Sequence, residues 1–276
     1  MDMQNMVSSL SDRVPTDNNT HMGDDGLLYC NRCHTARQSR FELFGKVRTV
    51  NCLCHCMAEE RDRQENERRR LEWMARVMSN RAVGFPDKEL QECTFDADDG
   101  SAPNLSNAMK AYVENFREFR KNGKGLLLYG SVGTGKTFYA ACIVNALIDH
   151  GYPCLMTNFP RLANQIAGMW EGKQEYIDSL RMFSLVAIDD LGVERDTEYM
   201  NEHVTTIIDS LYRAKVPMII TSNYTPKQLT ESSEIRKKRV YDRMLERCHP
   251  VKVDGPSRRK EMGRNDFLAM NKLLGL

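Results

Sequence analysis

Short, nearly continuous apolar runs alternate with longer amphipathic stretches in the C-terminal two thirds of the chain. The clearest apolar runs are GLLLYG at 125–130, PCLMTN at 153–158, SLVAI at 184–188 and VPMIITSN at 216–223. Between them, TFYAACIVNALIDHG at 137–151 and EYMNEHVTTIIDSLYRA at 198–214 carry apolar residues at helical spacing. Strands without polar alternation are typical of a parallel sheet covered on both faces. The pattern therefore predicts an α/β fold with a parallel central sheet and flanking helices.

The N-terminal third has a different pattern. Residues 1–26 are rich in polar and turn-forming residues, so we expect a flexible terminus there. Residues 58–81, AEERDRQENERRRLEWMARVMSNR, hold no Gly or Pro and are dense in helix formers. Acidic residues nearly balance their arginines, which favours a solvated linker helix over a nucleic-acid site. A change of composition near Val83 divides the chain into a flexible end at 1–26, a module with its helical linker at 27–82, and a larger domain at 83–276.

Composition and charge exclude several classes of protein. The chain has 276 residues, of which 41% are hydrophobic, enough for a sizeable core. Its 39 Lys and Arg nearly balance its 38 Asp and Glu, so the net charge of +1 predicts no global attraction to nucleic acid or to a membrane. No apolar stretch approaches the length of a membrane span, and the N-terminus lacks the order of a signal peptide. We therefore expect a cytoplasmic protein with no membrane partner, in which any basic site is local.

The sequence GSVGTGKT fits the phosphate-loop pattern G-x-x-x-x-G-K-[ST] without a mismatch, and it lies between a predicted strand and a predicted helix. Its glycines would let backbone N–H groups face phosphate oxygens, and the helix N-terminus adds its dipole field. Lys136 should reach the β- and γ-phosphates, and Thr137 should bind Mg²⁺. The predicted phosphate-binding residues are Gly130, Ser131, Val132, Gly133, Thr134, Gly135, Lys136 and Thr137.

A second motif, LVAIDDLG at 185–192, ends a predicted core strand on two carboxylates. Adjacent carboxylates repel, and a buried charge without a partner is strongly disfavoured, so a cation is expected beside them. We expect Asp189 to hold Mg²⁺ with Thr137, and Asp190 to polarise the attacking water as the base for hydrolysis. Asp190 could instead cap the next helical turn. Asn223, at the end of another predicted strand, could position the water or serve only as a turn residue.

Five of the nine cysteines lie between residues 30 and 56. Such crowding in a chain without a secretion signal favours metal ligation over disulfides. A C-x-x-C pair and a later C-x-C-x-C run offer enough thiolates for a tetrahedral structural zinc site. The predicted zinc ligands are Cys30, Cys33, Cys54 and Cys56. Other donors that could take part are Cys52, His34 and His55, and unligated thiols are the alternative to a metal.

These motifs, followed by IITSNY, RVYDRM and GPSRR, resemble those of the DnaC/IstB family of AAA+ ATPases over residues 85–264. The resemblance implies an AAA+ P-loop NTPase domain, here preceded by a small zinc-binding module. It also implies that Asp190 is the hydrolytic acidic residue and that Asn223 is the residue called sensor 1. ATP and Mg²⁺ are the cofactors that this family uses.

Two arginines take their expected roles from the same resemblance. Arg243 in RVYDRM resembles the arginine finger that completes the ATP site of a neighbouring subunit. Arg258 in GPSRR resembles the sensor 2 arginine, although the adjacent Arg259 could take that role. Both roles stabilise charge that develops on the γ-phosphate. By spacing alone, Arg239, Arg243 and Arg247 share one helix face, and a solvated arginine stripe would be the ordinary interpretation.

The resemblance implies an ATPase, stimulated by DNA, that loads a hexameric replicative helicase onto single-stranded DNA. It also implies self-association through the AAA+ domain and helicase binding by residues 27–82, since some loaders of this family carry a zinc module that contacts the helicase. Candidate DNA-contacting residues are Lys173, Tyr224, Arg236, Lys237 and Lys238. Two alternatives stay open: an IstB-like transposition helper, which the zinc module disfavours, and a nucleotide-switched DNA-binding scaffold with little turnover.

Overall fold

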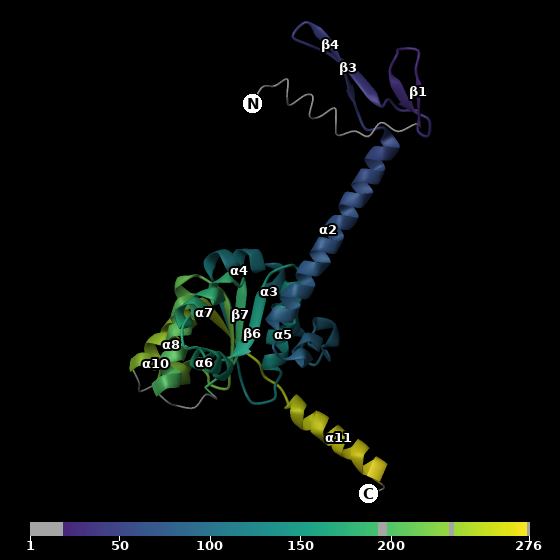
Figure 1. Ribbon diagram of the computed structural model, residues 1–276. Coiled ribbons are helices and arrows are strands. Elements are labelled where there is room, and N and C mark those ends of the chain that lie inside the picture. Colours follow the sequence, from purple (N-terminus) through teal and green to yellow (C-terminus); the bar gives the residue numbers. More distant parts are fainter. Residues whose placement is uncertain (1–18, 193–197, 232–234, 275–276) are drawn as a thin grey trace. The chain divides into compact units, whose positions relative to one another are not determined.

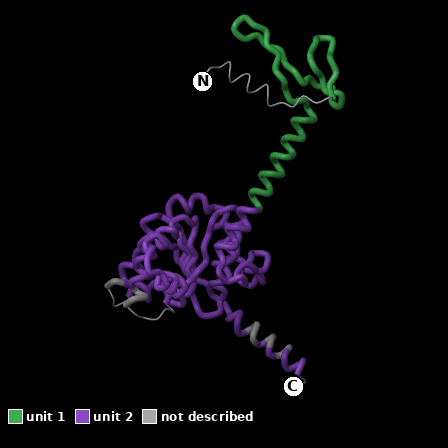
Figure 2. The backbone as a smooth tube through the Cα atoms, in the orientation of Figure 1, with its two compact units in different colours: residues 1–74 green, residues 75–276 purple. Residues whose placement is uncertain are grey.

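The structure is a computed structural model, and it describes residues 19–192, 198–231 and 235–274. The chain divides into two compact units, residues 1–74 and residues 75–276 (Figure 2). The division falls inside one long helix. None of the helices in these described ranges is long and apolar enough to cross a membrane.

The first unit consists of two antiparallel hairpins and the start of a helix (Figure 1). Its elements are β1 (Thr20–Met22), β2 (Leu28–Cys30), β3 (Gln38–Leu43), β4 (Lys46–Asn51) and α2 (His55–Gly84). β1 pairs with β2, and β3 pairs with β4. The flexible terminus expected at 1–26 lies outside the described residues as far as residue 18, and β1 occupies part of the remainder. Two-stranded hairpins are marginal on their own, so this unit needs a further source of stability.

The second unit is built on a five-stranded parallel sheet, which confirms the predicted α/β fold (Figure 1). Its strands are β5 (Gly125–Tyr129), β6 (Cys154–Asn158), β7 (Leu185–Leu191), β8 (Met218–Ser222) and β9 (Cys248–Lys252). They lie in the order β6-β7-β8-β5-β9. Leu127 of β5 lies beside Ile220 of β8 and beside Pro250 of β9. Because every pairing is parallel, the carboxyl ends of the strands meet at one edge of the sheet.

Helices cover both faces of this sheet. Successive residues of a strand point to opposite faces, so each strand contributes to two apolar clusters. Leu126 and Leu128 pack into one apolar cluster, whereas Leu127 packs into the other. The first cluster includes residues of α3 (Pro103–Glu114), α4 (Phe116–Asn122) and α5 (Lys136–Asp149). The second includes residues of α6 (Phe159–Ala167), α7 (Lys173–Ser179), α8 (Glu198–Arg213), α9 (Pro226–Thr230) and α10 (Ile235–Arg247). The apolar runs without polar alternation thus correspond to strands of a sheet that is covered on both faces.

The remaining elements in the described part of the second unit are three short helices and the last helix. Short 3-10 helices lie at η1 (Lys88–Glu92), η2 (Phe95–Ala97) and η3 (Leu180–Met182), and the last helix is α11 (Arg258–Leu274). Asn145 of α5 donates hydrogen bonds to the carbonyls of Leu90 and Cys93, at 2.9 and 2.8 Å. These bonds fix the η1 segment against the helix that follows the phosphate loop.

Candidate nucleotide site and metal centre

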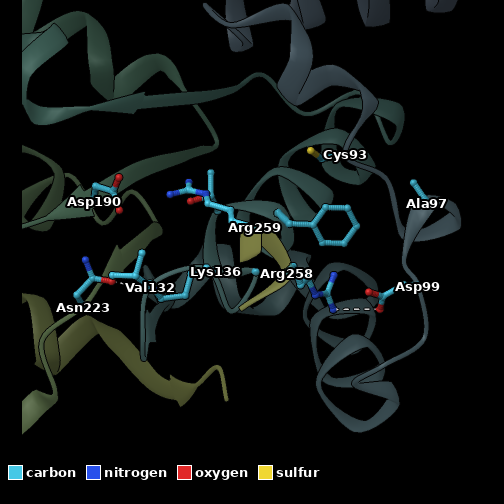
Figure 3. Close-up of a pocket in the computed structure, with 13 residues that line it drawn as sticks. Cys93, Ala97, Asp99, Val132, Lys136, Asp190, Asn223, Arg258 and Arg259 are labelled. Carbon is cyan, nitrogen blue, oxygen red and sulfur yellow. Dashed lines mark hydrogen bonds and ion pairs between the residues drawn. The ribbon is translucent and has the colours of Figure 1, made fainter. Parts of the chain in front are cut away.

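A pocket of about 820 Å³ opens at the carboxyl ends of the central strands (Figure 3). This edge is where ligands of open α/β sheets bind. The loop after β5, Asp190 of β7 and Asn223 after β8 line one side of it. Cys93 and Asp99, from the segment before α3, line the other side (Figure 3). The pocket therefore has a polar end, at the phosphate loop, and an opposite end bounded by the η1–η2 segment.

The phosphate loop joins β5 to α5, and tight packing explains its glycines. Gly133 has a φ of +84°, and a Cβ at this position would lie 2.2 Å from the Ser257 hydroxyl oxygen. Only glycine is free of this clash and of the penalty for a left-handed backbone. The Gly133 carbonyl also accepts a hydrogen bond from the Arg258 backbone N–H at 2.9 Å. The loop is thus tied to the segment that begins α11.

Lys136 lies at the centre of this end of the pocket. Its Nζ donates to the carbonyls of Gly130 and Ser131 at 3.0 and 2.8 Å, and to Asn223 Oδ1 at 2.9 Å. Burial lowers the pKa of Lys136, and the nearby Asp190 and Asp189 oppose this effect. A buried ammonium beside a phosphate loop is a point charge suited to the phosphates of a nucleotide.

Asp189 and Thr137, the two residues expected to bind Mg²⁺, are adjacent. Thr137 Oγ1 donates to the two Asp189 carboxylate oxygens at 2.9 and 3.1 Å, and Thr221 Oγ1 donates to Oδ1 at 2.6 Å. Burial raises the pKa of the Asp189 carboxyl. A cation beside this desolvated carboxylate would favour its charged form, and hydroxyl and carboxylate oxygens are ligands that Mg²⁺ prefers. The donor set therefore fits magnesium. Thr221 holds the Asp189 carboxylate in place. In the sequence, the only signal for this role is the position of Thr221 near the end of a predicted strand.

Asp190 has a left-handed backbone, with a φ of +57°. The pairing of β7 with β8 shifts between Ile188 and Leu191, so Asp190 sits in a bulge rather than in regular strand alternation. Its backbone N–H donates to Thr221 Oγ1 at 2.8 Å. Non-glycine residues pay of order 1 kcal/mol for this conformation, and such strain gathers at functional sites. The bulge turns the Asp190 side chain into the pocket beside Asn223 (Figure 3).

Arg258 and Arg259 both line the pocket, but they point in different directions (Figure 3). The Arg258 guanidinium lies 3.2 Å from the Asp99 carboxylate and donates to Ser101 Oγ at 3.0 Å. It also donates to the Tyr139 hydroxyl at 3.3 Å. Arg259 instead reaches toward the end that holds Asp190, and its charge contributes to the lowered pKa of Lys136.

Arg243 does not line the pocket of its own chain. It forms an ion pair with Asp209 of α8, and its guanidinium lies 5.8 Å from the centre of the Tyr212 ring. Arg213 pairs with the other oxygen of the same carboxylate at 2.6 Å. This position is compatible with a role on a neighbouring subunit and not with one on the chain's own nucleotide.

The structure brings together four cysteines of the first unit. Their sulfur atoms all lie within 4.8 Å of one another: Cys30, Cys33, Cys54 and Cys56. The Cys30–Cys56 and Cys54–Cys56 sulfur distances are 3.7 and 3.4 Å. A zinc ion with Zn–S bonds of about 2.3 Å places its four sulfurs about 3.8 Å apart, so the cluster fits tetrahedral zinc. Cys52 is turned away, because its thiol donates to the Ala36 carbonyl at 3.4 Å.

The environment of the cluster favours thiolates at some positions and opposes them at others. The Thr35 hydroxyl and nearby backbone N–H groups lower the pKa of Cys33 to about 5. The Cys33 and Arg32 N–H groups lower the pKa of Cys30. Interaction with Cys54 raises the pKa of Cys56 to about 12. A dication at the centre would remove this conflict, because it stabilises all four thiolates together.

The sheet order, the loop after β5, the acidic end of β7 and the polar residue after β8 define the AAA+ class of P-loop nucleotide-binding proteins. Within this class, the sequence profile described as IstB-like ATP binding protein matches residues 46–265, and the chain belongs to that family. The resemblance noted in the sequence motifs is thereby confirmed.

Several characterised proteins share this similarity. The replicative helicase loader DnaI of Bacillus subtilis is 25% identical over 70% of this chain and 66% of its own length. The loader DnaC of Escherichia coli K12 is 25% identical over 56% of this chain and 63% of its own length. The matches therefore span less than two thirds of the length of either loader. An ATP-binding protein of a Mycobacterium tuberculosis insertion sequence is 26% identical over 73% of this chain and 81% of its own length. A crystal structure of DnaI, 25% identical, superposes with a TM-score of 0.52 over 65% of this chain and 98% of that chain.

Proposed function

We propose that this protein is an ATPase that loads a hexameric replicative helicase onto single-stranded DNA. The observation that carries the ATPase part is the pocket in which Lys136, the Thr137–Asp189 pair and Asp190 with Asn223 converge. The loader part is supported by the similarity to proteins named replicative helicase loaders.

Each residue of the polar end has a role in this proposal. Lys136 binds the β- and γ-phosphates, and Thr137 with Asp189 holds Mg²⁺, which neutralises phosphate charge. Asp190 accepts a proton from the attacking water, and Asn223 orients that water. Asn223 Oδ1 accepts a hydrogen bond from Lys136 Nζ. The same amide side chain would therefore contact both the ammonium that binds the phosphates and the attacking water.

We assign the contact with the γ-phosphate to Arg259 rather than to Arg258. Arg259 reaches toward Asp190, whereas Arg258 lies beside Gly135 of the phosphate loop and is held by Asp99 and Ser101, away from Asp190 (Figure 3). Arg243 would act on the ATP of a neighbouring subunit, which requires self-association through the AAA+ domain. Guanidinium groups suit both roles because they stabilise charge that develops on the γ-phosphate.

The partners are proposed from the family and from the division of the chain. The first unit, with zinc held by the four cysteines, would bind the helicase. The AAA+ domain would contact DNA through exposed basic and aromatic residues such as Lys173, Lys238 and Tyr224. Lys237 of the same expected set is half-buried, and the side chain of Arg236 lies outside the described residues.

The test is a loading assay with the helicase of the same organism, circular single-stranded DNA, ATP and Mg²⁺. We expect helicase to accumulate on the DNA only when the protein is present. Lys136→Ala should abolish both loading and phosphate release, whereas Asp190→Asn should bind ATP and stop phosphate release. Lys121→Ala, which removes an exposed lysine of α4, is the matched control and should load normally. Phosphate release by Lys136→Ala at the wild-type rate would refute the assigned site.

A transposition helper is the second candidate, because an insertion-sequence protein is similar to 73% of this chain. The two functions differ in their partner. A helper would form no complex with the replicative helicase, yet its ATPase activity would still respond to DNA. Light scattering of the protein mixed with helicase and ATP distinguishes them, since only a loader gives a particle of the combined mass.

A further inference from the structure

The β3–β4 hairpin of the first unit is exposed on both faces. Every residue from Ser39 to Thr49 is exposed to solvent except Leu43, which is half-buried. Phe41 lies directly opposite Arg48, and Leu43 lies opposite Lys46. Residues that face each other across an antiparallel pair project to the same side of it. One side of the hairpin therefore carries an aromatic ring opposite one long cationic side chain, Arg48, with a second, Lys46, two residues along the partner strand.

The turn of this hairpin holds a second aromatic residue in a costly conformation. Phe44 and Gly45 form a two-residue turn with φ angles of +51° and +70°. Asn or Asp followed by Gly suits such a turn, whereas a bulky side chain pays of order 1 kcal/mol for a left-handed backbone. Burial does not repay this cost, because 79% of Phe44 is exposed. An outlier that folding does not explain points to a function for the side chain.

The charge of the hairpin indicates what covers these rings. Between Gln38 and Asn51 the sequence carries Arg40, Lys46 and Arg48 against the single acidic residue Glu42. Among the described residues, neither Lys46 nor Arg48 has an ion-pair partner. On α2, by contrast, Arg63 pairs with Glu60 and Arg70 pairs with Glu67. The cations of the hairpin are thus available to an anionic partner.

We propose that the β3–β4 hairpin is a binding site for single-stranded nucleic acid. Bases would stack on Phe44 and Phe41, and Lys46 and Arg48 would contact the adjoining phosphates. Sequence-tolerant binding of single strands combines exposed aromatic rings, on which bases stack, with nearby cations that contact the backbone. This site is separate from the ATP pocket and does not depend on ATP hydrolysis or on helicase loading.

The first test measures the salt dependence of binding to a short, labelled oligothymidine by fluorescence anisotropy, with the full chain and no nucleotide. Each phosphate contact to a single strand contributes about 0.7 to the slope of log affinity against log salt. We expect the double variant Lys46→Ala, Arg48→Ala to reduce the slope by about 1.4. The matched control, Arg63→Ala with Arg70→Ala, removes two ion-paired cations of the same unit and should leave the slope unchanged. Equal slopes for wild type and the hairpin variant would overturn the proposal.

The second test separates stacking from folding. Phe44→Asn introduces a residue suited to the turn, so the hairpin should keep or gain stability while losing the ring. We expect its affinity for the oligonucleotide to fall about tenfold, since one stacked base is worth roughly that factor or more. Photo-crosslinking with 5-iodouracil oligonucleotides should mark the 38–51 peptide in wild type and lose that mark in the variant.

Two results would contradict the assignment to nucleic acid. Crosslinks confined to residues 75–276 would place all DNA binding in the second unit. Loss of helicase binding by Phe44→Asn, with oligonucleotide affinity unchanged, would show that the exposed rings dock a protein. Neither result would affect the proposed ATPase, which the Lys136→Ala variant tests on its own.

Discussion

At the scale of single residues, Arg258 and Arg259 leave the same helical turn toward different ends of the nucleotide pocket (Figure 3). If Arg259 contacts the γ-phosphate, Arg259→Gln should weaken ATP binding about tenfold and leave ADP binding unchanged, because one charge-assisted hydrogen bond is worth about that factor. Arg258→Gln should weaken ATP and ADP binding by equal factors, because Arg258 holds the Asp99–Ser101 segment against the phosphate loop at Gly135, away from Asp190. Competition against a fluorescent ADP analogue measures all four affinities.

Arg258→Gln and Arg259→Gln serve as controls for each other, because each variant removes one guanidinium group from the same helical turn. A loss of ATP binding alone in Arg258→Gln would return the sensor 2 role to Arg258.

The same residues show what the sequence could predict. Lys136 and Thr137 follow from a contiguous motif, because their geometry is fixed within one loop. Asp190 was expected in the site, but the sequence does not reveal the bulge and the left-handed φ that turn its side chain into the pocket. The direction of Arg258 depends on contacts with Asp99 and Ser101, more than 150 residues away in sequence, which the local motif does not encode.

At the scale of elements, the contact between α8 and α10 fixes the side chain expected to act on a neighbouring subunit. Asp209 of α8 binds Arg243 of α10, and Tyr212 lies under the same guanidinium. We expect Asp209→Asn to reduce ATP turnover about tenfold without changing ATP affinity, because a neutral amide holds a guanidinium less firmly than a carboxylate does. Steady-state phosphate release and equilibrium nucleotide binding test the two halves of this prediction.

A mixing experiment shows whether Asp209 acts through Arg243. Lys136→Ala chains cannot bind ATP productively but present an intact Arg243 to their neighbours. Adding them should restore turnover to Asp209→Asn chains and equally to Arg243→Ala chains. If Arg243→Ala is rescued and Asp209→Asn is not, Asp209 has only a structural role. If neither is rescued, Arg243 does not act between subunits.

The sequence predicts the strands of the large sheet better than it predicts the hairpins of the first unit. Four of the five strands of the large sheet are buried on both faces and stand out as apolar runs. The fifth, β9, with the sequence CHPVK, is partly exposed and does not. The hairpins of the first unit have strands of three to six residues with few buried side chains, and such strands leave no clear periodicity. The cysteine spacing identified this unit where the hydrophobic pattern could not.

At the scale of the whole molecule, the first unit has little apolar core, so its fold should depend on the metal. We expect about one zinc per chain by metal analysis of protein prepared without chelator. Cys33→Ser should lose the zinc, because Cys33 belongs to the group of four sulfurs. Cys52→Ser is the matched control and should keep it, because the Cys52 thiol bonds to the Ala36 carbonyl instead. A metal-free but folded wild type would refute the zinc site.

Metal removal should also separate the two units by function. The second unit has its own sheet and two apolar clusters, so its stability does not need the cysteines. Chelation should therefore expose the amides of residues 19–54 to rapid hydrogen exchange and leave those of β5, β7 and β8 protected. Fluorescent ADP should bind with unchanged affinity, whereas the complex with the helicase should be lost in light scattering. Loss of ADP binding in parallel with zinc would show instead that the nucleotide pocket depends on the metal-bound unit.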